Sequence, residues 1–301
     1  MLNYDDSKQF IELGVSLYAS EIDPSKSDDV NLKQIVPISL LTHIKYIEYK
    51  VNSLEEIDNI REIVEGSDRY CVIHAPDIQT DDWTDIIFEL SKIQNIRLIN
   101  VHARPDDVFT LCQSCCRRIV NLNTTLQICD YCGELLNEYQ VPPLVCNNDQ
   151  KTIVDKLNAA SHILEKKNIR LSVENTYEPP YLLKQILDQV PANVGFTLDV
   201  GHTLLYHPFT TDYIYVLRDR LCHLHLHDNM GGNSERYHDV HIAPGQGIAN
   251  WTVISKALNK IGYDQTATLE CQPDALQTDF LFGLLNAIYL KTEELKGGTN
   301  G

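Results

Sequence analysis

The stretch "TIVDKLNAASHILEKKNIRLSVENT", residues 152–176, joins two patterns that recur along the whole chain. Residues 152–167 have the apolar spacing and the charged face of an amphipathic helix, whereas 169–176 form a short β-branched run typical of a buried strand. The run ends on the polar residues Glu174 and Asn175. A helix followed by such a strand is part of a β/α repeat, and the number of these repeats decides the fold.

Short β-branched runs of this kind predict eight strands in all: 13–19, 45–51, 70–76, 96–103, 169–176, 193–202, 221–228 and 265–270. Helical patterns lie between them, for example over 52–66, 82–93 and 250–262. Eight strands that alternate with helices predict an α/β protein with a (β/α)₈ TIM barrel. A doubly wound open sheet is the alternative, but no Gly-rich phosphate loop follows the first strand.

One long interruption breaks this alternation after the fourth strand, over residues 104–147. Without it, the chain of 301 residues is close to the ~250 residues typical of such a barrel. We therefore predict two units, a barrel made of residues 1–103 and 148–301 and an insertion made of residues 104–147.

The insertion carries two C-x₂-C pairs, Cys112/Cys115 and Cys129/Cys132, and Gly133 follows the second pair. Two such pairs at this separation predict one tetrahedral Zn²⁺ held by four thiolates, as in a zinc ribbon. The alternative is two chance pairs of buried cysteines. A segment of this size buries little core, so the metal is expected to fold it, as a structural element, a lid or a docking surface for a protein or nucleic-acid partner.

Composition narrows the class of protein and of partner. The formal net charge is −17, which disfavours broad nucleic-acid binding unless bound cations create a local positive site. No apolar run approaches the length of a membrane span, and the first residues lack a secretory signal, so a cytoplasmic protein without a membrane partner is expected. The chain has nine cysteines, and in such a protein any clustered ones favour metal binding over disulfides.

Metal-type ligands follow the predicted strands at their C-terminal ends, which meet at one mouth of a barrel. The candidates are His74, His102, Glu174, Asp199, His202, His225 and Glu270, joined by Asp239 and His241 from the loop after the seventh strand. His223 and His227 fall on the same face of their strand as His225, so the pattern does not separate these three. Carboxylates and imidazoles on so many strand ends predict a metal site.

At these residues the chain resembles the xylose-isomerase-like barrel superfamily and, within it, the endonuclease IV family of apurinic/apyrimidinic endonucleases. The matching motifs are "VENT", "LDVGH", "HLHLHD", "DVHIAPGQG" and the terminal Glu270. The resemblance implies up to three zinc ions. His74, His102 and Glu174 would hold the first, Glu174 would bridge to a second completed by Asp199, His225 and Glu270, and His202, Asp239 and His241 would hold the third.

Two functions follow from this resemblance. The first is metal-dependent hydrolysis of a phosphodiester, with abasic DNA as one candidate substrate. It is the preferred prediction, because a barrel that uses one metal does not need His74, His102, Asp239 and His241 together. The second is a sugar or sugar-phosphate isomerase or epimerase that uses a single Zn²⁺, Mn²⁺ or Mg²⁺ on Glu174, Asp199, His225 and Glu270. Glu174 and Glu270 are the candidate catalytic residues. The acidic segment "SEIDPSKSDDV" after the first strand stands where a DNA-contacting loop would carry Arg, so the metal chemistry carries over better than the DNA contacts.

Overall fold

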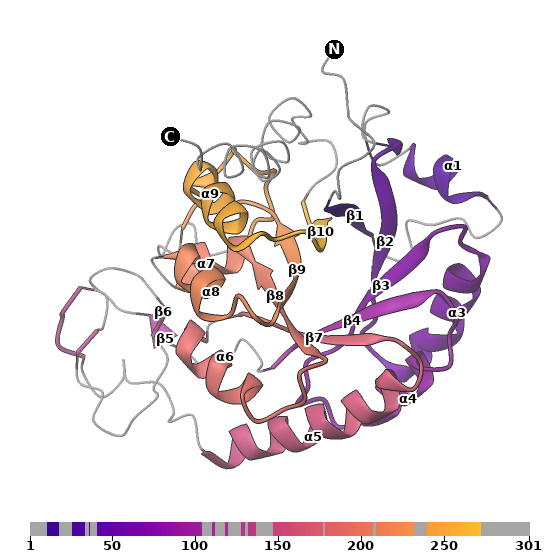
Figure 1. Cartoon of the computed structure of the whole chain (residues 1–301), viewed down its shortest axis with the longest axis horizontal. Helices are drawn as coiled ribbons and strands as arrows, with labels where there is room; N and C mark the ends of the chain where they lie inside the picture. Colours follow the sequence, from indigo (N-terminus) through magenta and orange to yellow (C-terminus); the bar gives the residue numbers. More distant parts are fainter. Residues whose placement is uncertain are drawn as a thin grey trace, which may run out of the picture.

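The computed structural model describes residues 11–17, 26–33, 36, 41–103, 110–111, 118–119, 128–129, 132–136, 147–176, 178–206, 209–231 and 239–271. Eight parallel strands form a closed barrel in the order β1, β2, β3, β4, β7, β8, β9 and β10, and β10 pairs with β1. Figure 1 shows the helices arranged around these strands. The predicted TIM barrel is confirmed, and the open sheet is excluded.

All eight predicted strands are present near their expected positions. They are β1 (Glu12–Leu17), β2 (Ile44–Lys50), β3 (Tyr70–His74), β4 (Ile96–His102), β7 (Arg170–Glu174), β8 (Val194–Asp199), β9 (Leu221–Leu226) and β10 (Thr266–Leu269). β8 and β9 are buried along their whole length, as expected of parallel strands that are covered on both faces.

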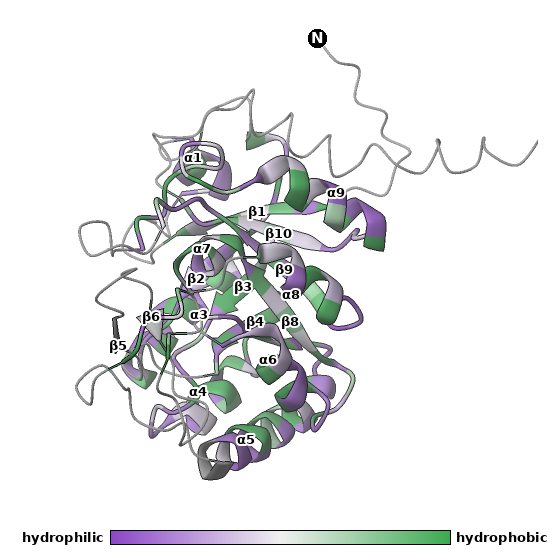
Figure 2. Ribbon diagram, turned by 90° about the vertical axis from the view of Figure 1, so that its left-hand side faces the viewer, coloured by the Kyte–Doolittle hydropathy of each residue, from purple (hydrophilic) through white to green (hydrophobic). Residues whose placement is uncertain are grey.

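The helices in the described part of the chain cover the outside of the barrel (Figures 1 and 2). They are α1 (Asp28–Leu32), the 3₁₀ helix η2 (Leu54–Glu56), α3 (Ile57–Gly66), α4 (Trp83–Leu90), α5 (Asn147–Glu165), α6 (Pro180–Leu187), α7 (Val200–Tyr206), α8 (Thr210–Val216) and α9 (Trp251–Ile261). α9 shows why their ends are well defined: the Asn250 side chain accepts a hydrogen bond from the Val253 amide, and Gly262 ends the helix in the left-handed region at φ 70°. None of the described helices has the length and apolar character to cross a bilayer.

The two faces of each strand have different chemistry, and this difference positions the site. The outward row of β8 contains Phe196 and Leu198, which are buried in the main hydrophobic core. Side chains alternate along a strand, so Thr197 and Asp199 face the barrel interior. Inside the barrel, the hydroxyls of Ser172 on β7 and Thr197 on β8 form a hydrogen bond of 2.7 Å. The interior is therefore polar toward the C-terminal ends of the strands, where the metal-type ligands lie.

Little of the insertion is described. β5 (Thr110–Leu111) and β6 (Arg118–Ile119) form a two-stranded antiparallel sheet, and β6 contacts α7. Cys112 and Cys115 lie outside the described residues. Around the second pair, the Gly133 amide donates to the Cys129 carbonyl at 2.9 Å, and Gly133 has φ 74°, a tight turn of the kind expected for a zinc knuckle. The zinc ribbon and the proposed domain boundaries stay predictions.

Candidate metal centre

Four groups of metal-type side chains lie together at the mouth of the barrel, within the described residues. The ligand atoms of each group all lie within 4.8 Å of one another. The groups are Glu174/Asp199/His225/Glu270, His74/His102/Glu174, His202/His227/Asp239/His241 and Glu48/His223/His225. All nine ligands expected from the sequence are brought together, and Glu48, His223 and His227 join them.

The first group, called here the carboxylate set, consists of Glu174, Asp199, His225 and Glu270. Nδ1 of His225 lies 2.9 Å from Glu270 Oε2, 3.3 Å from Glu174 Oε2 and 3.6 Å from Asp199 Oδ2. Glu174, Asp199 and His225 lie at the C-terminal ends of the neighbouring strands β7, β8 and β9, and Glu270 follows β10. The pairing of β8 with β9 places Asp199 directly beside His225. Three carboxylates and one imidazole around a common point form an oxygen-rich cation site.

His74 and His102 stand on the other side of Glu174. His74 Nε2 lies 3.3 Å from Glu174 Oε2, and His102 Nε2 lies 3.4 Å from Glu174 Oε1. The side chain of Asn100 also donates to Glu174 Oε2. Glu174 is fully buried and is shared by two groups, so its carboxylate is positioned to bridge two ions.

Each imidazole is oriented by a hydrogen bond from one ring nitrogen. In four of them Nδ1 is the donor. His74 donates to the Ala75 carbonyl and His102 to the Asp77 side chain. His202 donates to the Asn175 carbonyl and His241 to the Glu270 carbonyl. His225 is reversed, because its Nε2 donates to Glu48 Oε1 at 3.0 Å. Such bonds fix the ring and aim the other nitrogen at the centre, which is the usual arrangement of metal-binding histidines.

Buried polar atoms without a hydrogen bond test whether a metal fits. His102 Nε2, Glu174 Oε1 and His225 Nδ1 are all buried and make no hydrogen bond in the described structure. Buried polar atoms normally have partners, and here the two ring nitrogens face the Glu174 carboxylate, at 3.4 Å for His102 Nε2 and 3.3 Å for His225 Nδ1. The donor set and its unsatisfied atoms therefore fit divalent cations.

The close contact of imidazoles and carboxylates shifts the pKa values of both kinds of side chain strongly. Burial disfavours protonation of His102, but the charge of Glu174 and the hydrogen bond to Asp77 outweigh it and raise the pKa to about 10. The pKa of His241 is raised to about 9 against burial by Asp239 and by the charge of Glu270. Burial opposes ionisation of Glu174, yet the surrounding imidazoles hold its pKa well below the usual range. The carboxylates are thus ionised, as cation ligands must be.

The loop carrying Asp239 and His241 is organised by the buried carboxylate of Asp228. Its Oδ2 accepts hydrogen bonds from the Gly245 amide at 3.0 Å and from Trp251 Nε1 at 2.8 Å, and its Oδ1 accepts from the Ala249 amide at 3.0 Å. A Cβ at Gly247 would lie 2.2 Å from Asp228 Oδ1, so only glycine fits there. The glycines of "HIAPGQG" let the chain wrap around one carboxylate.

Sequence reasoning missed Glu48 altogether. It lies on β2, is 1% exposed, and holds both His225 and His223 through its two carboxylate oxygens. The available signal was a single acid in the run "KYIEYKV", where an unpaired buried charge is costly and so needs an ionic partner. Burial lowers the pKa of His223, whereas the surrounding carboxylates raise that of His225 well above its ordinary value.

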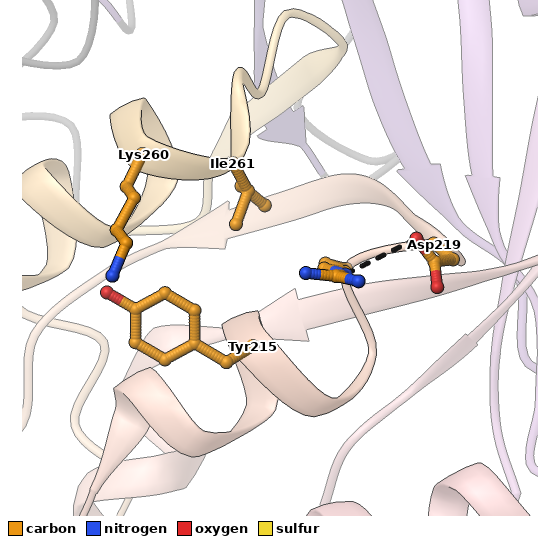
Figure 3. A pocket seen from close by; sticks show the side chains of 5 residues that line it. Tyr215, Asp219, Lys260 and Ile261 are labelled. Carbon is orange, nitrogen blue, oxygen red and sulfur yellow. Dashed lines mark ion pairs between the residues drawn. The ribbon is translucent and has the colours of Figure 1, made fainter.

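A separate hollow of about 410 Å³ lies outside the barrel between α8 and α9 (Figure 3). Its lining consists of Tyr215, Arg218, Asp219, Lys260 and Ile261. The Arg218–Asp219 ion pair there measures 3.5 Å, and both side chains are largely exposed. None of the metal-type groups found in the described part of the chain includes these residues, so the hollow is unrelated to the centre.

Comparison with known proteins agrees with this geometry. A family model described as a xylose isomerase-like TIM barrel matches residues 44–283. The chain belongs to this family. The uncharacterized protein MJ1311 of Methanocaldococcus jannaschii is 26% identical over 229 residues, which cover 70% of this chain and 69% of that protein.

Solved members of similar fold are mainly sugar epimerases and isomerases. A D-tagatose 3-epimerase-like protein superposes with a TM-score of 0.59 at 18% identity and covers 93% of this chain and 99% of its own. The 3-keto-D-glucoside 4-epimerase of E. coli has a TM-score of 0.58 at 11% identity and covers 93% of this chain and 98% of its own. At such identities the likeness to each structure establishes the barrel fold and leaves the substrate to be argued from the site.

Proposed function

We propose that this xylose isomerase-like protein is a divalent-metal-dependent sugar isomerase or epimerase. The observation that carries the proposal is the carboxylate set, in which three acids and one histidine surround a point at the barrel mouth. Glu174, Asp199, His225 and Glu270 would hold the metal. When bound, the cation would polarise a carbonyl and hydroxyl pair of the sugar. Oxygen-rich sites suit Mn²⁺ or Mg²⁺ better than imidazole-rich sites do.

Glu174 and Glu270 are the residues proposed to move the proton. Both lie within 3.3 Å of His225 Nδ1, so they flank one small volume. The Glu174 side chain is fully buried, whereas that of Glu270 is 19% exposed and reaches the solvent side. Burial opposes ionisation of Glu270, but the charge of His225 keeps its pKa below the ordinary value, so it starts as the base form.

The names of similar structures support the same class of chemistry. They include an L-ribulose 3-epimerase and a D-psicose 3-epimerase besides the two epimerase-type proteins described above. The net charge of −17 also favours a small polar substrate over a polyanion such as DNA.

Hydrolysis of a phosphodiester, the function preferred from the sequence, becomes the second candidate, because the similar solved structures are mainly sugar epimerases and isomerases. One observation favours it. His74 and His102 add two imidazoles on the far side of Glu174, so this carboxylate could bridge two ions. A bridged metal pair makes hydroxide available near neutral pH, and a single-metal isomerase does not require the extra histidines as ligands. Zinc ions at these positions, with abasic DNA as a candidate substrate, remain the alternative. The insertion, with zinc on Cys112, Cys115, Cys129 and Cys132, would then be a docking element.

Solvent proton exchange distinguishes the two candidates. The protein, stripped with chelator and reloaded with Mn²⁺, Mg²⁺ or Zn²⁺, is incubated in D₂O with a panel of ketopentoses and ketohexoses and their phosphates. An isomerase or epimerase will introduce deuterium next to the carbonyl only when the metal is present. An abasic-site oligonucleotide is incubated in parallel.

Glu270→Gln serves as the matched variant because it keeps the size of the side chain and removes the base. It should lose exchange while still folding. Zinc-dependent cleavage of the oligonucleotide without any sugar exchange would replace the isomerase proposal with the hydrolase.

A further inference from the structure

The third group of side chains at the mouth differs in chemistry from the carboxylate set. It consists of His202, His227, Asp239 and His241, and is called here the histidine set. Nε2 of both His202 and His241 lies 2.9 Å from Asp239 Oδ2. Three imidazoles with one carboxylate make a nitrogen-rich site of the kind that suits Zn²⁺.

His227 is the member whose position has no assigned role. Its side chain is fully buried, and its Nε2 donates to both oxygens of Asp199 at 2.9 Å. Its Nδ1 is buried, makes no hydrogen bond with the residues that the structure describes, and lies 3.8 Å from Asp239 Oδ1. Its ring also lies parallel to that of His241, with centroids 4.0 Å apart. One nitrogen is thus anchored, while the other is unsatisfied and faces the rest of the histidine set.

The backbone makes room for this imidazole. A Cβ at Gly201, the glycine of the "LDVGH" motif, would lie 1.9 Å from His227 Cε1. Any residue other than glycine at position 201 would therefore displace the ring. Hydrogen bonds also fix the rings of the two other histidines. Nδ1 of His202 donates to the Asn175 carbonyl, and Nδ1 of His241 donates to the Glu270 carbonyl. Asn229 holds the carboxylate, because its side-chain amide donates to Asp239 Oδ1 at 2.8 Å.

The resemblance already implies a zinc ion on His202, Asp239 and His241. We propose that His227 is a fourth ligand in this chain and that it makes the histidine set a closed zinc site with a structural role. His202 and His241 would bind through Nε2, His227 through Nδ1 and Asp239 through one oxygen. Structural zinc sites have four protein ligands, whereas catalytic sites keep a position open for water or substrate. A fourth protein ligand leaves no such position, so this ion would not act on substrate.

The site would join three separate segments of the barrel mouth. His202 lies on α7, His227 follows β9, and the other two ligands lie on the loop that leads to α9. His241 has a φ of 43°, in the left-handed region that non-glycine residues adopt uncommonly, although histidine does so more often than most. A metal that binds all three segments would hold this loop against the barrel, whatever reaction the carboxylate set performs.

Metal content and zinc-dependent thermal unfolding of the full chain test the site. The variant is His227→Asn, which removes the imidazole but keeps a polar group beside Asp199. We expect it to lose one zinc per chain under limiting zinc, to bind zinc at that site at least about 100-fold more weakly, and to lose most of the rise in Tm that zinc gives the parent protein. Manganese binding by the carboxylate set should persist.

His223→Asn is the matched control, since His223 lies on β9 just before His227, is equally buried and belongs to a different group. It should keep the zinc and the zinc-dependent rise in Tm. If His227→Asn retains both as well, His227 is not a ligand and the closed site is wrong. If both variants lose the zinc, the loss reflects the fold and also contradicts a specific role for His227.

Cobalt provides a spectroscopic measurement that leaves the histidine set unchanged. Co²⁺ is added to metal-free full-length protein in which Cys112, Cys115, Cys129 and Cys132 are replaced by Ser, so that the predicted zinc ribbon does not contribute. It should give intense visible absorption from four-coordinate tetrahedral cobalt at the histidine set, displaced by one equivalent of Zn²⁺. Weak bands typical of six-coordinate cobalt alone would overturn the proposal, even if His227→Asn fails to fold.

Discussion

The carboxylate set and the histidine set lie side by side at one barrel mouth but have opposite compositions. The first has three carboxylates and one imidazole, and the second has one carboxylate and three imidazoles. A dication in the first set leaves a net charge of −1 if all carboxylates are ionised and the imidazole is neutral. In the second set the corresponding charge is +1. The first set therefore favours hard cations with open coordination, and the second favours closed binding of zinc.

Asp199 connects these two sets. One of its oxygens lies 3.6 Å from His225 Nδ1 in the carboxylate set, and both accept hydrogen bonds from His227 Nε2 at 2.9 Å in the histidine set. Carboxylate–histidine links of this kind fix the orientation of a ligand ring. The two sets thus meet at Asp199 but differ in their numbers of carboxylates and imidazoles, and this difference can be tested at either set.

The largest effect is expected at the carboxylate set. Glu270→Gln should lower turnover by about 10²–10⁴-fold, because it removes a proposed proton acceptor that lies at 2.9 Å from His225 Nδ1. Zinc content at the histidine set should not change, since Glu270 contacts that set only through its backbone carbonyl. Steady-state kinetics and metal analysis on the same sample check both statements. Full activity would show that Glu270 is not the acid or base.

The next largest effect is expected at Asp228, which does not belong to the histidine set but holds the loop that carries Asp239 and His241. Asp228→Asn should destabilise the fold by about 3 kcal/mol, because one buried carboxylate accepts hydrogen bonds from four donors of the loop around it. The loop carries Asp239 and His241, so zinc affinity should fall while manganese binding at the carboxylate set is retained. Chemical denaturation and parallel metal titrations measure these changes. Equal loss of both metals would mean that the sets are not independent.

A smaller effect is expected from Glu48. Glu48→Gln removes the charge that accepts the hydrogen bond from His225 Nε2, while keeping the shape of the side chain. Manganese affinity at the carboxylate set should fall about 10-fold to 100-fold, and zinc affinity at the histidine set should be unchanged. Isothermal titration with each metal gives the comparison. Unchanged manganese affinity would reduce Glu48 to a packing role.

The smallest effect is a pH dependence of the metal-free protein. The raised pKa values of His102 and His241, about 10 and about 9, mean that both imidazoles are charged at pH 7.5 and paired with carboxylates. A raised pKa stabilises the fold fully below the unfolded value near 6.5, and this contribution disappears as the pH rises through 9 to 10. Tm of the chelator-treated protein should therefore decline over that window more steeply than Tm of the metal-loaded protein.

Proton release on metal binding is a second test of the raised imidazole pKa values. Ligand imidazoles must be neutral, so binding at pH 7.5 should release protons, detectable with an indicator dye in weak buffer. Absence of proton release on saturation with zinc would show that His241 is not one of the residues that bind it.

Much of the fold could be predicted from the sequence. The strand runs, such as 193–202 and 221–228, differ in pattern from the helical segments between them, and a parallel strand followed by a helix has few ways to pack. The TIM barrel was therefore expected, and it is confirmed. The insertion is different: its first cysteine pair lies outside the described residues, so the ribbon rests on spacing alone.

The sequence by itself also determined that His74, His102, Glu174 and Asp199 would share one mouth, because the C-terminal ends of parallel barrel strands must meet there. It did not determine how the histidines of β9 and its following loop are divided. His223, His225 and His227 share one face by the two-residue period, and local pattern contains nothing to separate them.

Only the tertiary structure decided that division. Glu48 on β2 binds His223 and His225 from across the barrel, and Gly201 on α7 leaves the space that His227 occupies. These partners are far away in the chain, and their approach depends on strand register and barrel closure. Local periodicity fixes the face on which a side chain lies, whereas long-range packing fixes which partner each ring nitrogen meets.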